Sequence, residues 1–195
     1  MRRFIKRFRG WTLSRLKHAK KKARWAVRNL VNGVRIKTEL STGTFPSADL
    51  TRYERSVCSQ NGEDGILEAI FTVIGTTNKY FVEFGVGSGR SCNSARLAGR
   101  YGWTGLWMDG KAGPSRGPLA VYREFITAEN ITPLLEKYGV PESFDLLSID
   151  IDGSDYWVWK AITKHRPRVV VIEYNASVPP TESRVIEYDP EFRWP

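Results

Sequence analysis

Residues 80–89 constrain the fold of this chain more than any other stretch. Residues 80–84 are aromatic or β-branched apart from Glu83, which is typical of a short central strand covered on both faces. Glycine then stands at every other position, as Gly85, Gly87 and Gly89. Because glycine lacks a Cβ, the backbone can turn tightly here and approach a ligand. A strand, such a turn and a following helix predict the first unit of a nucleotide-binding α/β fold with a doubly wound parallel sheet.

The residues around the turn distinguish between classes of nucleotide. The dinucleotide fingerprint G-x-G-x-x-G needs its third glycine at position 90, which is Arg90. The carboxylate of Glu83 would repel a phosphate but attract an ammonium group. S-adenosylmethionine has an amino-acid end and an adenosine end, so it fits this pattern, and the alternative is a glycine-rich turn without a ligand. Ser91 or Asn93 is expected to cap the helix that follows.

Three ordered segments resemble a known family. They are residues 83–89 (EFGVGSG), 145–157 (DLLSIDIDGSDYW) and 167–175 (PRVVVIEYN). The first resembles motif I of class I SAM-dependent methyltransferases, and the other two resemble the FkbM-like branch of that superfamily. The resemblance covers about residues 59–177. It implies a Rossmann-like methyltransferase fold and methyl transfer from S-adenosylmethionine to oxygen of a small or glycosidic acceptor.

Several residues are candidates for the cofactor site. Glu83 would hold the amino group, and the backbone of residues 85–89 the methionine end. Asp109 ends the second expected strand 20 residues after the third glycine, where a carboxylate can accept hydrogen bonds from both ribose hydroxyls; the alternative is an ordinary loop acid. The resemblance further implies that Glu129 and Asn130 meet the adenine, although Asn130 could equally cap the helix expected over 132–138. It also implies that two residues of the polar segment before motif I, Gln60 and Glu63, line the mouth of the site; the alternative is an ordinary helix start with Ser59 or Asn61 as its N-cap.

An acidic group follows the fourth and fifth expected strands, residues 144–151 and 168–173. Asp150 and Asp152 are two residues apart, so they would share one face of an extended strand and could share a metal or a proton. Either would orient or deprotonate the acceptor hydroxyl. Metal-dependent O-methyltransferases have an Asp after the fourth strand and an Asp-Asn pair after the fifth. Here Glu173 and Asn175, with Tyr174 between them, occupy the latter place. Such oxygen ligands favour Mg²⁺, whereas the alternative is loop acids that shape the pocket.

Charge divides the chain into a basic extension and a mildly acidic domain. Residues 1–37 hold 14 of the 30 Lys and Arg residues and no acid, while the other 16 stand against all 21 Asp and Glu residues. The pattern predicts a basic amphipathic helix over 1–37, a linker over 38–52 and a methyltransferase-like domain over 53–195. The helix suits an anionic membrane surface, a solvated lead-in, nucleic acid or a transit peptide. A nucleic-acid-binding core is not indicated.

The cysteines and the hydropathy of the chain indicate its compartment. Cys58 and Cys92 have no zinc-type spacing, which agrees with a reducing compartment. No apolar run approaches the ~20 residues that span a bilayer. We therefore expect a cytoplasmic protein, peripheral at the inner face of a membrane. The chain has no G-x-S-x-G and no P-loop motif, which excludes those classes of hydrolase and phosphoryl-transfer enzyme.

The residues after Asn175 predict a sheet that is incomplete at its C-terminal side. Only 184–188 are strand-like, and four prolines accompany them. The fifth strand would then lie at or near an open edge, which invites pairing with a second copy of the chain. A homodimer that covers this edge, or a truncated domain with weak cofactor binding, is expected. The alternative to an enzyme is a membrane- or partner-binding module that keeps the fold without turnover.

Overall fold

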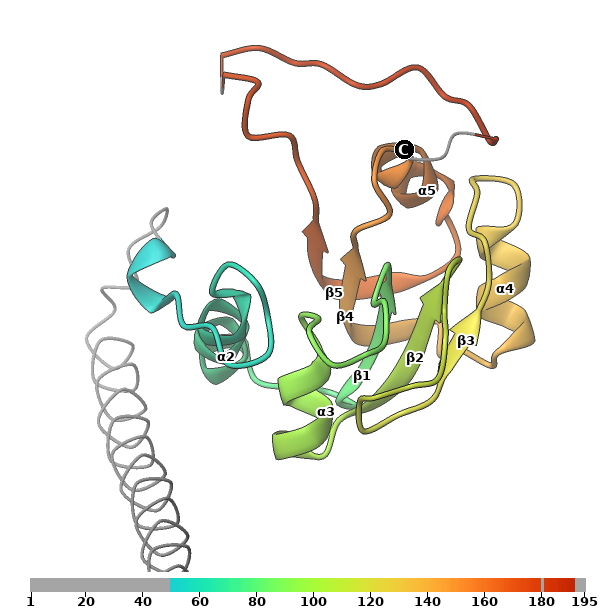
Figure 1. Ribbon diagram of the computed structural model, residues 1–195. Coiled ribbons are helices and arrows are strands. Elements are labelled where there is room, and N and C mark those ends of the chain that lie inside the picture. Colours follow the sequence, from blue (N-terminus) through green and yellow to red (C-terminus); the bar gives the residue numbers. More distant parts are fainter. Residues whose placement is uncertain (1–49, 180, 192–195) are drawn as a thin grey trace, which may run out of the picture. The chain divides into compact units, whose positions relative to one another are not determined.

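A five-stranded parallel sheet forms the centre of the computed structural model, which describes residues 50–179 and 181–191 (Figure 1). The strand order is β3-β2-β1-β4-β5, so the strand that precedes the glycine-rich turn lies in the middle. The strands are β1 (Tyr80–Phe84), β2 (Thr104–Asp109), β3 (Val121–Arg123), β4 (Ser143–Ile149) and β5 (Arg166–Ile172). The helices are η1 (Thr51–Tyr53), α2 (Glu63–Ile74), α3 (Ala95–Tyr101), α4 (Ile131–Lys137) and α5 (Asp155–Ala161). The expected helix over 1–37 and most of the expected linker lie outside the described residues.

The helices cover both faces of the sheet, as alternation along the strands requires. Phe81 and Trp107 point to the face covered by α2 and α3, with their ring centroids 5.9 Å apart. Val82 and Met108 point to the opposite face, where α4 and Val158 of α5 cover them. The two sides are visible in Figure 1, where α2 and α3 lie on one side of the strands and α4 on the other. The predicted doubly wound, Rossmann-like parallel sheet is therefore confirmed.

Several predicted elements have different bounds in the structure. β1 and β2 have their predicted bounds, but the third strand is only Val121–Arg123 instead of 119–127. The side chain of Asn130 explains this, because its Oδ1 accepts the N–H of Thr127 at 2.8 Å and its Nδ2 donates to the carbonyl of Phe125 at 2.8 Å. Both backbone groups are thereby unavailable to a strand ladder. The strand-like residues 184–188 do not form a strand.

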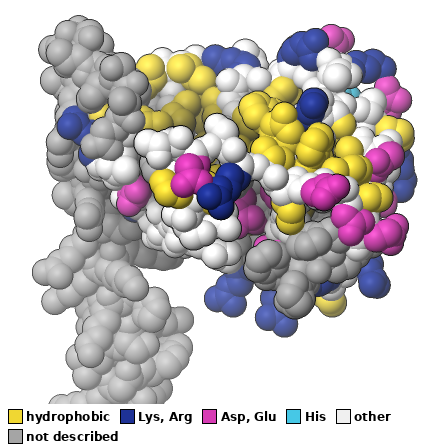
Figure 2. All heavy atoms as spheres, turned by 90° about the horizontal axis from the view of Figure 1, so that it is seen from above, with side chains coloured by type: hydrophobic (Ala, Val, Ile, Leu, Met, Phe, Trp, Pro, Cys, Tyr) yellow, Lys and Arg dark blue, Asp and Glu magenta, His cyan; other side chains and the backbone are white. Residues whose placement is uncertain are grey.

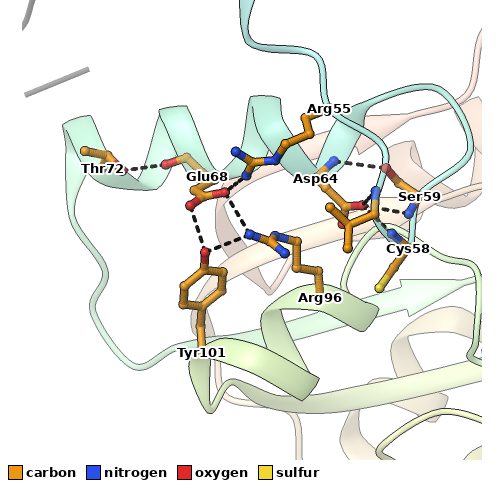
Figure 3. Close-up of polar contacts among 9 residues, drawn as sticks. Arg55, Cys58, Ser59, Asp64, Glu68, Thr72, Arg96 and Tyr101 are labelled. Carbon is orange, nitrogen blue, oxygen red and sulfur yellow. Dashed lines mark hydrogen bonds and ion pairs between the residues drawn. The ribbon is translucent and has the colours of Figure 1, made fainter. Parts of the chain in front are cut away.

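The segment before α2 is folded around the carboxylate of Asp64 (Figure 3). Asp64 Oδ2 accepts the N–H groups of Val57, Cys58 and Ser59 at 2.7, 2.6 and 2.9 Å. In return, Ser59 Oγ accepts the N–H of Asp64 at 3.0 Å. Gly62 is the N-cap residue of α2, although Ser59 or Asn61 was expected there. This closed turn fixes the polar segment 59–64 at the start of the domain.

A second polar cluster joins α2 to α3 (Figure 3). Glu68 on α2 accepts hydrogen bonds from Arg55, from Arg96 at 3.3 Å and from the hydroxyl of Tyr101 at 2.7 Å. Arg96 is buried, and its guanidinium also donates to Tyr101 at 3.0 Å. Burying a charge is costly unless it is paired, and Glu68 supplies the opposite charge for Arg96 at the α2–α3 contact.

β5 is an edge strand in the described part of the chain, as predicted. It pairs in parallel with β4 over the register Ser143↔Arg166 to Ile149↔Ile172. Its side chains are only half-buried, because the two helical layers cover it less fully than they cover β1. Within residues 50–179 and 181–191, no helix has the length and apolar character needed to cross a membrane.

Candidate functional site

The residues singled out from the sequence gather at one edge of the sheet. All five strands are parallel, so their carboxyl ends meet at the same edge, where ligands of open α/β sheets bind. The glycine-rich turn follows β1, Asp109 ends β2 and residues 124–130 follow β3. The acidic residues follow β4 and β5. This edge is the candidate functional site.

The three glycines of the turn have different roles, although each has a positive φ. A Cβ on Gly85 would lie 1.5 Å from the carbonyl oxygen of Asp150, and a Cβ on Gly89 would lie 2.8 Å from the ring of Trp107. These two positions must be glycine because other parts of the protein pack against them. A Cβ on Gly87 would meet nothing within 4 Å. Gly87 is exposed, so the turn is open to a ligand at this residue.

The carboxylate of Glu83 is buried and makes all its hydrogen bonds within the protein. Its Oε1 accepts the N–H of Asn93 at 2.7 Å and the hydroxyl of Ser148 at 3.3 Å. Its Oε2 accepts the N–H of Ser94 at 2.9 Å and a short hydrogen bond from the Ser94 hydroxyl. These four bonds fill the acceptor positions of a carboxylate. The side chain that was expected to meet an amino group instead binds the segment between the turn and α3.

Glu83 thereby replaces the expected helix cap. Ser94 is the N-cap residue of α3, and neither Ser91 nor Asn93 supplies a side-chain cap. The Ser94 hydroxyl also accepts the indole N–H of Trp107 at 2.7 Å, which ties the cluster to β2. Burial raises the pKa of Glu83 above its ordinary value, and the hydrogen bonds from Ser94 and Asn93 oppose that rise.

Asp109 lies at the end of β2 and contacts the glycine-rich turn. Its Oδ2 accepts the N–H of Gly87 at 2.7 Å, and its Oδ1 accepts the N–H of Lys111 at 2.7 Å. Each oxygen makes one bond, so each keeps a second acceptor position. The backbone carbonyl of Asp109 accepts the N–H of Glu124 at 3.3 Å, which joins the end of β2 to the segment after β3.

Glu129 and Asn130, the residues expected beside an adenine, face different partners. Glu129 is exposed, and its Oε2 accepts a hydrogen bond from the hydroxyl of Tyr188 at 2.6 Å. That hydrogen bond is the main reason why the pKa of Glu129 is lowered. The side chain of Asn130 is used by the backbone of residues 125–127, as described above. Only Glu129 therefore offers a side-chain acceptor to a ligand here.

Three acidic side chains come together after β4 and β5. Asp150, Asp152 and Glu173 place one carboxylate oxygen each within 4.8 Å of one another, and all three residues are exposed. The predicted reason for this proximity is wrong, because Asp150 and Asp152 do not lie on an extended strand. β4 ends at Ile149, and the chain turns through Asp152 at a φ of 58°. The turn is held by buried Asp155, which sequence reasoning did not place in the site.

The carboxylate of Asp155 fixes this turn from inside. Its Oδ1 accepts the N–H of Ile151 and its Oδ2 the N–H of Gly153, both at 2.9 Å. Asp155 is 7% exposed and begins α5. An acidic residue at a helix start with a glycine two residues before it was the available signal. Asp155 therefore orients Asp150 and Asp152 without lying at the surface itself.

The acidic cluster shifts the pKa values of its members. Loss of solvent and the charges of Asp150, Asp155 and Asp152 raise the pKa of Glu173 to about 7. Loss of solvent, Asp155 and Asp152 also raise the pKa of Asp150, while its hydrogen bond with Glu173 opposes the rise. The charge of Glu63, at the start of α2, adds to the rise for Asp150. Of the two residues expected at the mouth of the site, Glu63 thus acts electrostatically on this cluster and Gln60 is exposed.

The cluster can carry out two kinds of chemistry. A carboxyl group with a pKa near neutrality can accept a proton from a substrate, and three carboxylate oxygens can hold a hard divalent cation such as Mg²⁺. Asn175, the fourth expected ligand, turns its Oδ1 to Ser177, whose N–H and hydroxyl donate at 3.0 and 2.6 Å. The donor set present is therefore Asp150, Asp152 and Glu173. Figure 2 looks down on the molecule from above Figure 1 and shows acidic side chains beside a patch of hydrophobic ones on this face.

Comparison with known proteins adds no further assignment. The chain matches no protein-family model, no curated protein and no solved structure. The Rossmann-like fold follows from the strand order itself. The activity must be inferred from the residues at the carboxyl edge of the sheet.

Proposed function

We propose that the chain is a methyltransferase that uses S-adenosylmethionine and methylates a hydroxyl oxygen of a small or glycosidic acceptor. The observation that carries the proposal is the 2.7 Å hydrogen bond from Gly87 N–H to Asp109 Oδ2. It joins the open residue of the glycine-rich turn to an acidic residue at the end of the next strand. A ligand with an amino-acid end and a ribose needs these two features side by side.

The hydrogen-bonding groups that follow β1, β2 and β3 support a nucleoside ligand at this part of the edge. In the proposal, the exposed backbone at Gly87 lies against the methionine end, because no side chain covers it. The free acceptor positions of Asp109 take the ribose hydroxyls. Ala128 N–H and Glu129 offer one donor and one acceptor to the nucleobase. Glu83 acts as a positioning residue that fixes the turn from beneath.

The acidic cluster is proposed to act on the acceptor. The bound cofactor would supply a methyl group on a positively charged sulfur, which is open to in-line displacement by an oxygen. Glu173, with its pKa near 7, or its neighbour Asp150 accepts the hydroxyl proton of the acceptor as that oxygen attacks. Asp152, beside them, orients the hydroxyl. The same three residues would hold Mg²⁺ if the reaction requires one, and their oxygen ligands fit that ion.

Binding of S-adenosylhomocysteine, measured by calorimetry, tests the proposal on the folded full chain. Asp109→Ala removes the ribose acceptor and should weaken binding by about 1.5–3 kcal/mol. Glu142→Ala is a matched control, because Glu142 is an exposed acid just before β4, at the amino end of that strand. If wild type and control bind neither S-adenosylmethionine nor S-adenosylhomocysteine, the methyltransferase proposal fails. A binding module that keeps only the fold would then remain.

The acceptor is sought by transfer of a labelled methyl group. A set of sugars and lipid-linked sugars is incubated with labelled S-adenosylmethionine and the wild-type chain. The Glu173→Gln and Asp150→Asn variants should lose methyl transfer and keep cofactor binding. In the proposal these two residues accept the proton of the acceptor hydroxyl and do not contact the cofactor. Methyl transfer by both variants at the wild-type rate would show that the acidic cluster takes no part in the reaction.

A further inference from the structure

The C-terminal segment 181–191, here called the strap, contacts the candidate site through Tyr188 and the carbonyl of Ile186. Every residue of the strap is exposed except Tyr188, which is half-buried. The strap forms no strand or helix. In Figure 1 it runs above the carboxyl ends of the strands towards α5. Among the described residues, Tyr188 makes the side-chain hydrogen bonds that join the strap to the segment after β3.

Two elements of the site hold the strap. The hydroxyl of Tyr188 donates to Glu129 Oε2 at 2.6 Å and accepts the N–H of Ala128 at 3.1 Å. On α5, the ring of Trp157 lies 5.7 Å from the ring of Tyr188, and its indole N–H donates to the carbonyl of Ile186 at 2.9 Å. The first pair of contacts uses the backbone donor and the side-chain acceptor that the proposed function assigns to the nucleobase.

The hydroxyl of Tyr188 has the hydrogen-bonding pattern of an adenine edge. A phenol is one donor and one acceptor at the same atom. Adenine likewise presents an amino donor next to a ring-nitrogen acceptor. The aromatic ring of Tyr188 further resembles a base in being flat and able to pack against Trp157. Tyr188 thus satisfies Ala128 and Glu129 as a nucleobase would.

We propose that the strap is an internal plug of the nucleobase subsite, with Tyr188 in the place of the adenine. This inference rests on the proposed function, since it takes Ala128 and Glu129 as the residues that meet the base. The nucleoside must displace Tyr188, so the apparent affinity of the cofactor falls with the fraction of molecules whose strap is docked. The strap is exposed and forms no helix or strand, and segments of this kind open locally more readily than the core, which makes displacement feasible.

Tyr188→Phe tests the plug in the full chain, because it removes both hydrogen bonds and keeps the ring. Loss of these bonds should raise the affinity for S-adenosylhomocysteine by roughly five- to ten-fold in calorimetry. Tyr156→Phe is the matched control, since Tyr156 is an exposed tyrosine of α5 whose hydroxyl makes no hydrogen bond with the described residues. The control should leave the affinity unchanged.

The indole N–H of Trp157 reports on the strap independently of ligand affinity. The chain has seven tryptophans, and Trp157→Phe identifies the signal of this one in a nitrogen–proton correlation spectrum. In Tyr188→Phe the signal should move, because the bond to Ile186 is lost as the strap leaves. Saturating S-adenosylhomocysteine should move the wild-type signal in the same direction.

The outcomes separate the plug from the proposed function. Tighter binding by Tyr188→Phe, together with the ligand-induced shift of the Trp157 signal, supports the plug. If wild type and Tyr188→Phe bind S-adenosylhomocysteine equally and the Trp157 signal does not move, the plug is wrong and the methyltransferase proposal is unaffected. Absence of binding by wild type and by both variants overturns the proposed function, and the assignment of a nucleobase to Ala128 and Glu129 fails with it.

Discussion

Arg168 Nη1 lies 2.8 Å from Asp145 Oδ1 and joins the edge strand β5 to the interior of β4. The carboxylate of Asp145 is fully buried. It also accepts the N–H groups of Thr77, Asn78 and Lys79, at 2.8–3.1 Å, so it closes the loop that leads into β1. One side chain therefore holds β5, β4 and the entrance to β1 together.

Asp145→Ala should destabilise the protein by about 3–5 kcal/mol, because three N–H groups lose their acceptor and the Arg168 guanidinium loses its counter-charge and keeps only the carbonyls of Ile74 and Gly75. Urea unfolding of wild type and variant measures the change. Glu142→Ala is the control, since this exposed acid lies three residues away and should change the stability by less than about 0.5 kcal/mol. A variant as stable as the control would contradict the structural role of Asp145.

The stability of the protein should fall steeply in acid because of the same residue. Burial alone would raise the pKa of Asp145, but Arg168 and the N–H groups of Thr77 and Lys79 lower it below its ordinary value. The folded state thus binds its proton less readily than the unfolded chain does. The stabilisation is complete above the unfolded pKa of about 3.9, and it is lost as the pH falls from there through the folded pKa. Asp145→Asn should show a shallower loss of urea stability below about pH 4.

Substitutions of two glycines in the turn should affect different properties: Gly85→Ala the stability of the protein, and Gly87→Ala chiefly the binding of the ligand. Gly85→Ala should cost more than about 4 kcal/mol, because its Cβ would lie 1.5 Å from the Asp150 carbonyl oxygen. Gly87→Ala should cost only about 1–2 kcal/mol for its left-handed backbone, since its Cβ enters open space. That Cβ should nevertheless weaken S-adenosylhomocysteine binding at least about ten-fold. Calorimetry on a folded Gly87→Ala protein with wild-type affinity would remove this residue from the ligand site.

Glu83→Gln distinguishes a positioning role from a direct contact with the cofactor. An amide has one acceptor oxygen instead of two, so Asn93 N–H or Ser94 N–H loses its partner at a cost of about 1–3 kcal/mol. Ser148→Ala removes the 3.3 Å bond to Glu83 and the 3.1 Å bond that Ser148 accepts from Asn93 Nδ2, but both N–H groups keep the carboxylate, so it should cost less. If Glu83 held an amino group directly, the variant would lose affinity without losing stability. Urea unfolding and calorimetry on the same samples decide between the two.

Magnesium should raise the unfolding temperature of wild type if the acidic cluster holds the ion. Ligand that binds only the folded state stabilises it by RT ln(1 + [L]/Kd), which is about 2.7 kcal/mol at one hundred times Kd. Glu173→Gln and Asp152→Asn each remove a charged ligand and should abolish the shift, whereas Glu142→Gln should retain it. A wild-type protein that Mg²⁺ does not stabilise would leave the three carboxylates as proton acceptors only.

The fold was predictable where hydrophobic pattern alone decides it. The bounds of β1 and β2 and the doubly wound sheet follow from runs of apolar residues and from the glycine-rich turn between them. The third strand was predicted too long because its shortening depends on the side chain of Asn130 binding the backbone of Phe125 and Thr127. Hydrogen bonds from a side chain to the backbone of this kind cannot be predicted from the hydrophobic pattern.

The sequence predicts where the residues of the candidate site lie better than it predicts which partners their side chains contact. Parallel strands must end at one edge, so the sequence located Asp109, Asp150 and Glu173 at the same edge. It did not show that Glu83 points inward, because an acid within an apolar run can serve either a ligand or the protein. The contact of Tyr188 with Glu129 joins residues about sixty positions apart in the sequence, and no hydrophobic periodicity around Tyr188 indicates it.

The strand order has a consequence for the nascent chain. β1 pairs on one side with β2, made shortly after it, but on the other side with β4, as in the pairing of Phe81 with Leu146. Until residues 143–149 leave the ribosome, β1 is an edge strand of the synthesised β1–β2–β3 sheet, and the unpaired side of this aromatic strand is exposed to solvent. Exposed apolar strand edges of this kind attract chaperones and, without them, aggregate. We therefore expect a pause in synthesis between residues 124 and 142 to reduce the yield of native protein more than a pause after residue 150.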